Sequence, residues 1–374
     1  MEDMGWNGYT AQDGNGNAVQ DGNGNAVQDG NWYTAQDGNG YAAQADEVRA
    51  ARKHFSRLGM RFMVGTIVIF VLQTLALEIA DRFAPDLLND MNIYLLVSMM
   101  PMYLIGIPVL TLLVWKLPSQ APERRTMKPG QFAVSVLMAF ALMYVANIIG
   151  TIMTTIIGLF KRGGVQNNIA NVVSETSPLT VFFIMVICAP IVEEFVFRKL
   201  VVDRAVRYGQ GTAVVLSGLM FGLFHGNLNQ FMYATALGMF LAYLYVKTGK
   251  LKITIAIHML INFMGSIVSS WVLKLMNLEA LSRLDAGDIQ AVMEYLSENM
   301  LGFLLYMLYA FCILGIMIAG FVLFIVFAVK KRFVFARGAV SIPKGKRFRT
   351  VILNLGMGLY CIFWIGMIID QLFM

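Results

Sequence analysis

The sequence predicts an all-α membrane protein, a polytopic bundle of about eight or nine transmembrane helices with a disordered N-terminal tail. The first observation is composition: 57% of the 374 residues are hydrophobic and only 14% are charged. The mean hydropathy of +0.64 lies far above that of soluble globular domains. The second is the recurrence of long apolar runs, and the third is a polar repeat confined to the first 45 residues.

The apolar runs are long enough to cross a bilayer, because about 20 helical residues span the ~30 Å hydrocarbon core. Nine runs meet this length, near 62–82, 93–115, 132–159, 178–198, 211–227, 230–247, 253–273, 300–329 and 350–372. We divide them into N-terminal transmembrane helices (47–130), a central core (131–275) and a C-terminal part (276–374). In the last part, 285–299 has apolar residues at helical spacing, which predicts a short external amphipathic helix.

Residues 1–46 precede the first run and carry a repeat of period eight, in which Gln12, Gln20, Gln28, Gln36 and Gln44 recur. The segment is rich in Gly, Asn and Asp and offers too few aliphatic side chains to offset chain entropy by burial. It is predicted to be a disordered tail. Its Asp and Asn oxygens leave weak cation binding as an alternative.

Lysine and arginine are distributed unevenly between the loops. Residues 1–46 hold none, whereas basic clusters precede the first run and follow the second, fourth, sixth and eighth. By the positive-inside rule this asymmetry predicts a multi-pass protein of the cell membrane with a cytoplasmic N-terminus and an external C-terminus. The basic clusters are interpreted as topology signals and contacts with the lipid bilayer, and no nucleic-acid partner is expected.

Ionisable side chains are costly inside a membrane, so the few present point to function. Glu193, Glu194 and Arg198 end the fourth run, in "APIVEEFVFRKL". His225 lies at the end of the fifth, and the seventh contains His258 and Asn262. The remaining histidine, His54, lies in a basic stretch and is expected to be solvated. The three cysteines, Cys188, Cys312 and Cys361, show no metal-knuckle or disulfide spacing.

Helical spacing separates the roles of these residues. Glu194 and Arg198 form an i, i+4 pair with the acid first, the favourable orientation for a salt bridge. Glu193 is turned about 100° away, so that arginine leaves it unpaired and suited to take a proton from water. His258 and Asn262 also share a face and can present donors to a developing oxyanion.

These residues resemble three motifs of the CAAX-protease and bacteriocin-processing (Abi) family of intramembrane endopeptidases, and within it the type II CAAX prenyl endopeptidase group. "EEFVFR", "FGLFH" and "HMLIN" are similar to E-E-x-x-x-R, F-x-x-x-H and H-x-x-x-N. The resemblance covers roughly residues 130–275. It implies that Glu193 and His225 activate water, that His258 and Asn262 form the oxyanion hole, and that Glu194 and Arg198 are the supporting ion pair.

The sequence therefore predicts an intramembrane endopeptidase that acts on a membrane-associated or lipid-modified peptide or protein. A glutamate mechanism without cofactor is favoured, while zinc held by two histidines and a glutamate stays an alternative. A non-catalytic scaffold or a transporter is the competing class. For Glu193 to meet His225, the fourth helix must continue past Arg198 to about residue 206.

Overall fold

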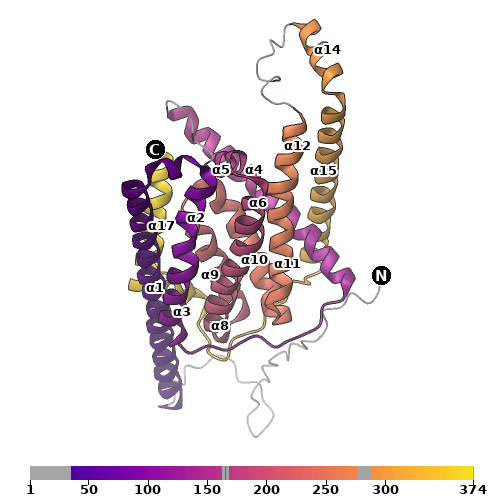
Figure 1. Cartoon of the computed structure of the whole chain (residues 1–374). Coiled ribbons are helices and arrows are strands. Elements are labelled where there is room, and N and C mark those ends of the chain that lie inside the picture. The colour runs from indigo at the N-terminus through magenta and orange to yellow at the C-terminus, as the bar shows by residue number, and fades with distance from the viewer. Residues whose placement is uncertain (1–34, 162–164, 166–167, 277–280, 282–287, 374) are drawn as a thin grey trace.

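The computed structural model describes residues 35–161, 165, 168–276, 281 and 288–373, and this part of the chain is helical, with no strand (Figure 1). The α-helices are α1 (Ala35–Phe83), α2 (Met91–Pro101), α3 (Ile107–Trp115), α4 (Pro129–Phe160), α5 (Asn168–Glu175), α6 (Pro178–Val181), α7 (Ala189–Glu194), α8 (Asp203–Ala205), α9 (Gln210–Phe224), α10 (Leu228–Thr248), α11 (Leu251–Asn262), α12 (Ser269–Leu275), α14 (Ile289–Glu298), α15 (Met300–Val329), α16 (Arg347–Val351) and α17 (Leu355–Phe373). The predicted all-α class is confirmed.

Seven helical stretches of the described chain are long and apolar enough to cross a membrane, close to the predicted eight or nine. They are Ala43–Phe83, Met91–Trp115, Pro129–Phe160, Pro178–Tyr208, Leu251–Leu275, Met300–Val329 and Leu355–Phe373. The predicted spans 211–227 and 230–247 correspond to α9 and α10, which are not among the seven. α9 has only 15 residues, and α10 packs against α4 and α9, so its surroundings are protein.

The fourth apolar run continues well beyond its hydropathic end. Its helix extends from Pro178 to Tyr208 and contains two π-helical segments, Phe182–Cys188 and Phe195–Val202. The glutamate pair therefore lies in the middle of a long helix, as the meeting of Glu193 with His225 requires. π-Helical turns inside α-helices are frequent at functional sites.

The N-terminal region differs from prediction in two respects. Helix α1 already includes residues 35–46, which were assigned to the disordered tail; the rest of that tail, 1–34, lies outside the described residues. His54 is buried instead of solvated, because α1 packs beside α8 and the His54 ring nitrogen Nε2 lies 2.9 Å from the Arg204 carbonyl oxygen.

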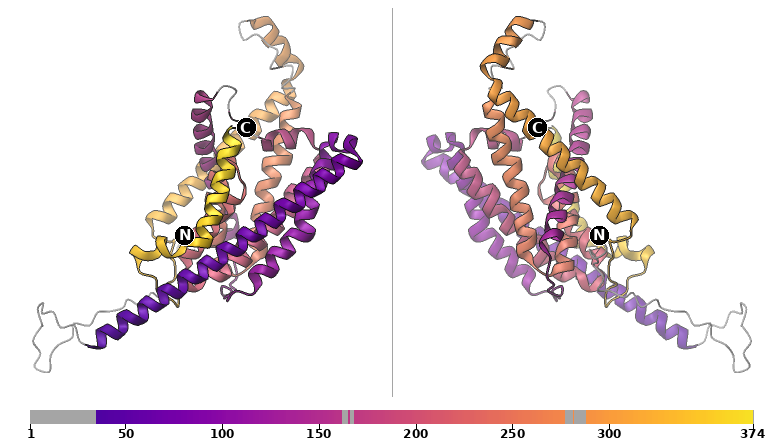
Figure 2. Two further views of the ribbon diagram at one scale, coloured as in Figure 1. Left: turned by 90° about the vertical axis from the view of Figure 1, so that its left-hand side faces the viewer. Right: turned by 90° about the vertical axis from the view of Figure 1, so that its right-hand side faces the viewer.

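The basic connectors meet at one end of the bundle, which we call the basic end and define as residues 116–128, 203–210, 247–252 and 330–349 (lower end in Figure 1). Backbone hydrogen bonds join them: the Gln120 amide donates to the Asp203 carbonyl oxygen at 2.6 Å, and the Arg125 amide to Thr248 at 2.8 Å. At the opposite end, α14 forms the predicted amphipathic helix, with Ile289 and Met293 exposed (Figure 2).

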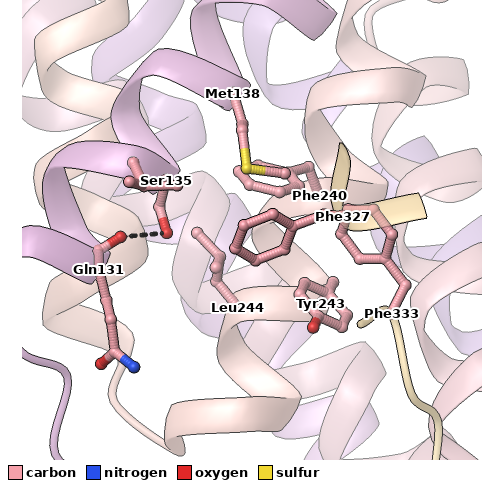
Figure 3. A pocket seen from close by; sticks show the side chains of 9 residues that line it. Gln131, Ser135, Met138, Phe240, Tyr243, Leu244, Phe327 and Phe333 are labelled. Atoms are coloured by element: carbon pink, nitrogen blue, oxygen red, sulfur yellow. Dashed lines mark hydrogen bonds between the residues drawn. The ribbon is translucent and has the colours of Figure 1, made fainter. Parts of the chain in front are cut away.

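Aromatic side chains fill the space where α10 meets α4 and the end of α15. The hollow left there has a volume of only about 20 Å³, enough for a water molecule but not for a peptide. Its lining comprises Gln131, Val134, Ser135, Met138, Phe240, Tyr243, Leu244, Phe327 and Phe333 (Figure 3). No chemistry-bearing cluster faces it, so the candidate site lies elsewhere, among α7, α9 and α11.

Candidate active site

A sealed ion pair forms the base of the site. The Arg198 guanidinium donates from Nε and Nη2 to the two carboxylate oxygens of Glu194, both at 2.9 Å. Both side chains have no exposed surface. A bidentate geometry with every charged atom engaged is the arrangement in which a buried pair is tolerated.

Ser217 on α9 completes the coordination of Arg198. Its hydroxyl oxygen accepts from Arg198 Nη1 at 2.9 Å and donates to the Phe197 carbonyl oxygen at 2.8 Å. Both serine contacts cross from α9 to the helix that carries the glutamates. The ion pair therefore fixes the position of α9 relative to that helix.

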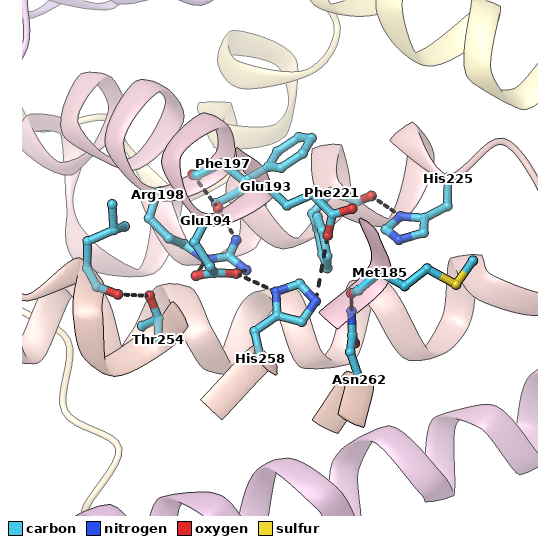
Figure 4. A network of polar contacts seen from close by, with 12 residues as sticks. Met185, Glu193, Glu194, Phe197, Arg198, Phe221, His225, Thr254, His258 and Asn262 are labelled. Atoms are coloured by element: carbon cyan, nitrogen blue, oxygen red, sulfur yellow. Dashed lines mark hydrogen bonds and ion pairs between the residues drawn. The ribbon is translucent and has the colours of Figure 1, made fainter. Parts of the chain in front are cut away.

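His258 on α11 lies between the two glutamates (Figure 4). Its Nδ1 is 3.1 Å from a Glu194 carboxylate oxygen, and its Nε2 is 3.6 Å from a Glu193 oxygen. An ionised carboxylate can only accept, so Nδ1 carries the proton of the first contact. The second distance is too long for a direct hydrogen bond. Glu194 thus orients His258 and directs its Nε2 at Glu193.

Glu193 and Glu194 are adjacent but meet different surroundings. The Glu193 side chain is 22% exposed, whereas Glu194 is completely covered. Arg198 contacts only the second of the two. Glu193 is consequently the carboxylate of the pair that can reach water or a bound substrate.

His225 closes α9 and points toward Glu193 (Figure 4). Its Nδ1 lies 2.8 Å from the Phe221 carbonyl oxygen, which can only accept, so the proton sits on Nδ1 and Nε2 presents a lone pair. The Phe221 ring meets the rings of His225 and His258 edge to face, at centroid distances of 4.8 and 5.7 Å. The Arg198 guanidinium lies 5.2 Å from the same ring centroid. One aromatic side chain thereby sets the positions of both histidines and the arginine.

Asn262 lies on the same face of α11 as His258. Its side chain was expected to face a substrate oxyanion, but it is bonded to the protein backbone. Its Nδ2 donates to the Met185 carbonyl oxygen at 2.8 Å. Met185 lies in the first π-helical segment, where the Ala189 amide bonds to Ile184, five residues earlier. The next such bond would come from residue 190, which is a proline without an N–H. Asn262 therefore satisfies a carbonyl that Pro190 leaves without its helical donor.

Among the described residues, no three His, Cys, Asp or Glu side chains are arranged to hold a metal ion. Glu194 is occupied by Arg198 and His258. The donor set of a zinc site is thus not assembled in this arrangement, and we derive no step through a metal.

The structure brings Glu193, Glu194, Arg198, His225 and His258 together, and connects Asn262 to the same helix as the glutamates. No role was predicted for Ser217, Met185 or Phe221, although Phe221 is the first residue of the quoted motif "FGLFH". Ser217, Phe221 and His225 recur every four residues on α9, so helical spacing back from His225 could have drawn attention to the first two. No sequence pattern singles out the Met185 carbonyl.

The fold and the site define a multi-pass membrane protein with a buried Glu–Arg–His centre. Comparison with known proteins identifies its relatives: residues 175–264 match the Type II CAAX prenyl endopeptidase Rce1-like family. Over these residues the chain is therefore similar to a family of CAAX-type membrane proteases.

Two curated proteins are similar to the chain. "Membrane-embedded CAAX protease MroQ" of Staphylococcus aureus (strain USA300) is 25% identical over 230 residues, which cover 58% of this chain and 91% of that protein. "Putative membrane peptidase YdiL" of Bacillus subtilis (strain 168) is 27% identical over 147 residues, or 37% of this chain and 59% of that protein. No solved structure matches the chain significantly.

Proposed function

We propose that the protein is an intramembrane endopeptidase that hydrolyses a peptide bond of a membrane-associated or lipid-modified substrate by glutamate-activated water. The observation that carries this proposal is the contrast between Glu193, partly exposed and not bonded to Arg198, and Glu194, sealed by Arg198 and His258. A general base must be accessible to water, whereas the group that positions it need not be.

In the proposed reaction, Glu193 takes a proton from water as the water oxygen attacks the scissile carbonyl carbon. Collapse of the tetrahedral intermediate breaks the C–N bond, and Glu193 returns the proton to the leaving amine. His225 helps to orient the water through Nε2. The oxyanion is stabilised by His258 in its doubly protonated form, which donates from Nε2 while Nδ1 stays on Glu194, and by the second amide hydrogen of Asn262.

The substrate class follows from the position of the site. Glu193 lies inside a membrane-spanning helix, so the scissile bond must enter the bilayer, as a membrane-proximal segment or a lipid-anchored C-terminus would. The polar turn at Asn227 and Gln230, beside His225 and half-buried, offers a route for water.

Comparative proteomics of membrane peptides tests the proposal, with cells carrying the wild-type protein, Glu193→Gln, His225→Ala or the control Glu47→Gln on the exposed part of α1. Cleavage fragments should fall by roughly 100-fold or more in the two site variants, the usual loss for a general base, and persist in the control. A scaffold or transporter would leave all fragments unchanged at normal expression. Metal analysis of the active, purified protein tests the mechanism, since activity with less than stoichiometric metal excludes zinc.

A further inference from the structure

A cavity of about 270 Å³ opens at the basic end, beside Gln210 in the first turn of α9. It lies where the α3–α4 connector, the α8–α9 junction, the end of α10 and the segment 336–339 meet. Its lining includes two arginines, Arg207 and Arg337, together with Gln120, Glu123, Gln210 and Val246. The proposed protease reaction uses none of these residues.

The charge of this lining is positive. In the described part of the chain, neither Arg207 nor Arg337 forms an ion pair with a carboxylate. The one acidic residue of the lining, Glu123, is paired with Arg125, whose Nη2 lies 2.8 Å from its carboxylate. Two arginines therefore line the cavity without a paired carboxylate, a combination suited to a phosphate group.

The segment that carries Arg337 is held in place by backbone contacts. The Gln210 amide donates to the Ala336 carbonyl oxygen, and the Val340 amide to the Arg207 carbonyl oxygen, each at 3.1 Å. The Gln210 side-chain oxygen also accepts from the Ala336 amide at 3.1 Å and from Lys247 Nζ at 3.0 Å. Arg337 thus stands between two anchors that shape this side of the cavity.

The surroundings decide between a soluble phosphate and a lipid. Val334 and Phe335, just before Arg337, are 46% and 43% exposed, and Arg207 is next to the end of the span Pro178–Tyr208. Charged groups at the end of a span with exposed apolar side chains beside them match a headgroup with acyl chains. We propose that this cavity binds the phosphate of an anionic phospholipid headgroup.

Native mass spectrometry of the detergent-purified full chain tests this proposal. The wild type should retain one molecule of dioleoyl-phosphatidylglycerol more tightly than dioleoyl-phosphatidylcholine. The double variant R207Q/R337Q should bind the anionic lipid roughly 30-fold more weakly, about fivefold for each arginine. R349Q is the matched control, because Arg349 is exposed at the same end but does not line the cavity, and it should bind as the wild type does.

Three outcomes would overturn the proposal. Equal binding of the two lipids would show that charge is not recognised, and equal loss in R349Q would show a diffuse effect of the basic end. Displacement of the lipid by inorganic phosphate at equal concentration would show a soluble-anion site instead. A circular-dichroism melt of the double variant, expected to match that of R349Q, separates lost binding from lost folding.

Discussion

At the scale of residues, one arginine separates two adjacent glutamates into two roles. Arg198 engages both oxygens of Glu194 and the hydroxyl of Ser217, and none of these hydrogen bonds goes to Glu193. The helical angle of about 100° between neighbouring side chains then leaves Glu193 toward the accessible side. The two residues are chemically identical, so it is their position on the helix that makes Glu194 a structural residue and leaves Glu193 accessible as the proposed general base.

The two glutamates should therefore respond differently to the same substitution. Glu194→Gln leaves the buried Arg198 without its counter-charge and should lower the free energy of unfolding by about 3–5 kcal/mol. Glu193→Gln removes no hydrogen bond of Arg198 and should unfold near the wild-type temperature while losing activity. Thermal unfolding in detergent measures both. Equal destabilisation by the two variants would contradict the assignment of roles.

At the scale of elements, a proline and an asparagine on different helices act as a unit. Pro190 removes the amide that would have bonded to the Met185 carbonyl, and Asn262 on α11 supplies a donor instead. The irregular helix is thereby pinned to α11, the helix that also presents His258. Asn262 accordingly has a structural partner in addition to its proposed contact with substrate.

A double-mutant cycle tests this coupling. Asn262→Ala alone should cost about 1–3 kcal/mol, because the partly buried Met185 carbonyl loses its donor. In the background of Pro190→Ala, which restores a backbone N–H, the same change should cost less, with a coupling energy on the order of 1 kcal/mol. Ser266→Ala, whose hydroxyl donates to the Asn262 carbonyl oxygen, serves as the control. Strict additivity in chemical unfolding would argue against a shared carbonyl.

Close packing of α9 against α10 places Ser217, Phe221 and His225. A Cβ on Gly222 would overlap the Thr235 side chain and come within 2.9 Å of the Phe231 carbonyl oxygen. Gly222→Val should therefore push α10 away and abolish activity, whereas Gly315→Val, where a Cβ meets nothing within 4 Å, should be tolerated. Yield of monodisperse protein and fragment production are the readouts. A fully active Gly222→Val protein would show that this contact does not hold the site.

Contacts within one helix could be predicted from the sequence, because they follow from helical spacing. Contacts between different helices could not. The Glu194–Arg198 pair follows from i, i+4 spacing, and the confirmed helix class follows from composition. Ser217 and Phe221 share the helical face of His225, but their partners lie on other helices, and spacing within one helix does not specify those partners. The two predicted spans outside the seven, 211–227 and 230–247, correspond to a helix of only 15 residues and to one packed against α4 and α9, and neither feature can be read from an apolar run alone.

At the scale of the whole molecule, the two ends of the bundle carry different charge. The basic connectors gather at one end through the backbone contacts described above. Helix α17 runs parallel to α1, since Gly59 contacts Met357 and the Phe70 ring lies 5.6 Å from that of Phe363. The C-terminus thus lies away from the basic end (Figure 1).

This polarity predicts the orientation in the membrane. With Cys188, Cys312 and Cys361 replaced by alanine, single cysteines can be placed at Gly345 in the basic end and at Asp288 at the other end, both exposed. Because basic loops are retained in the cytoplasm, an impermeant maleimide should label Asp288→Cys in intact cells and Gly345→Cys only after permeabilisation. The reverse pattern would place the basic cavity outside the cell and invert the side from which the proposed headgroup reaches Arg207 and Arg337.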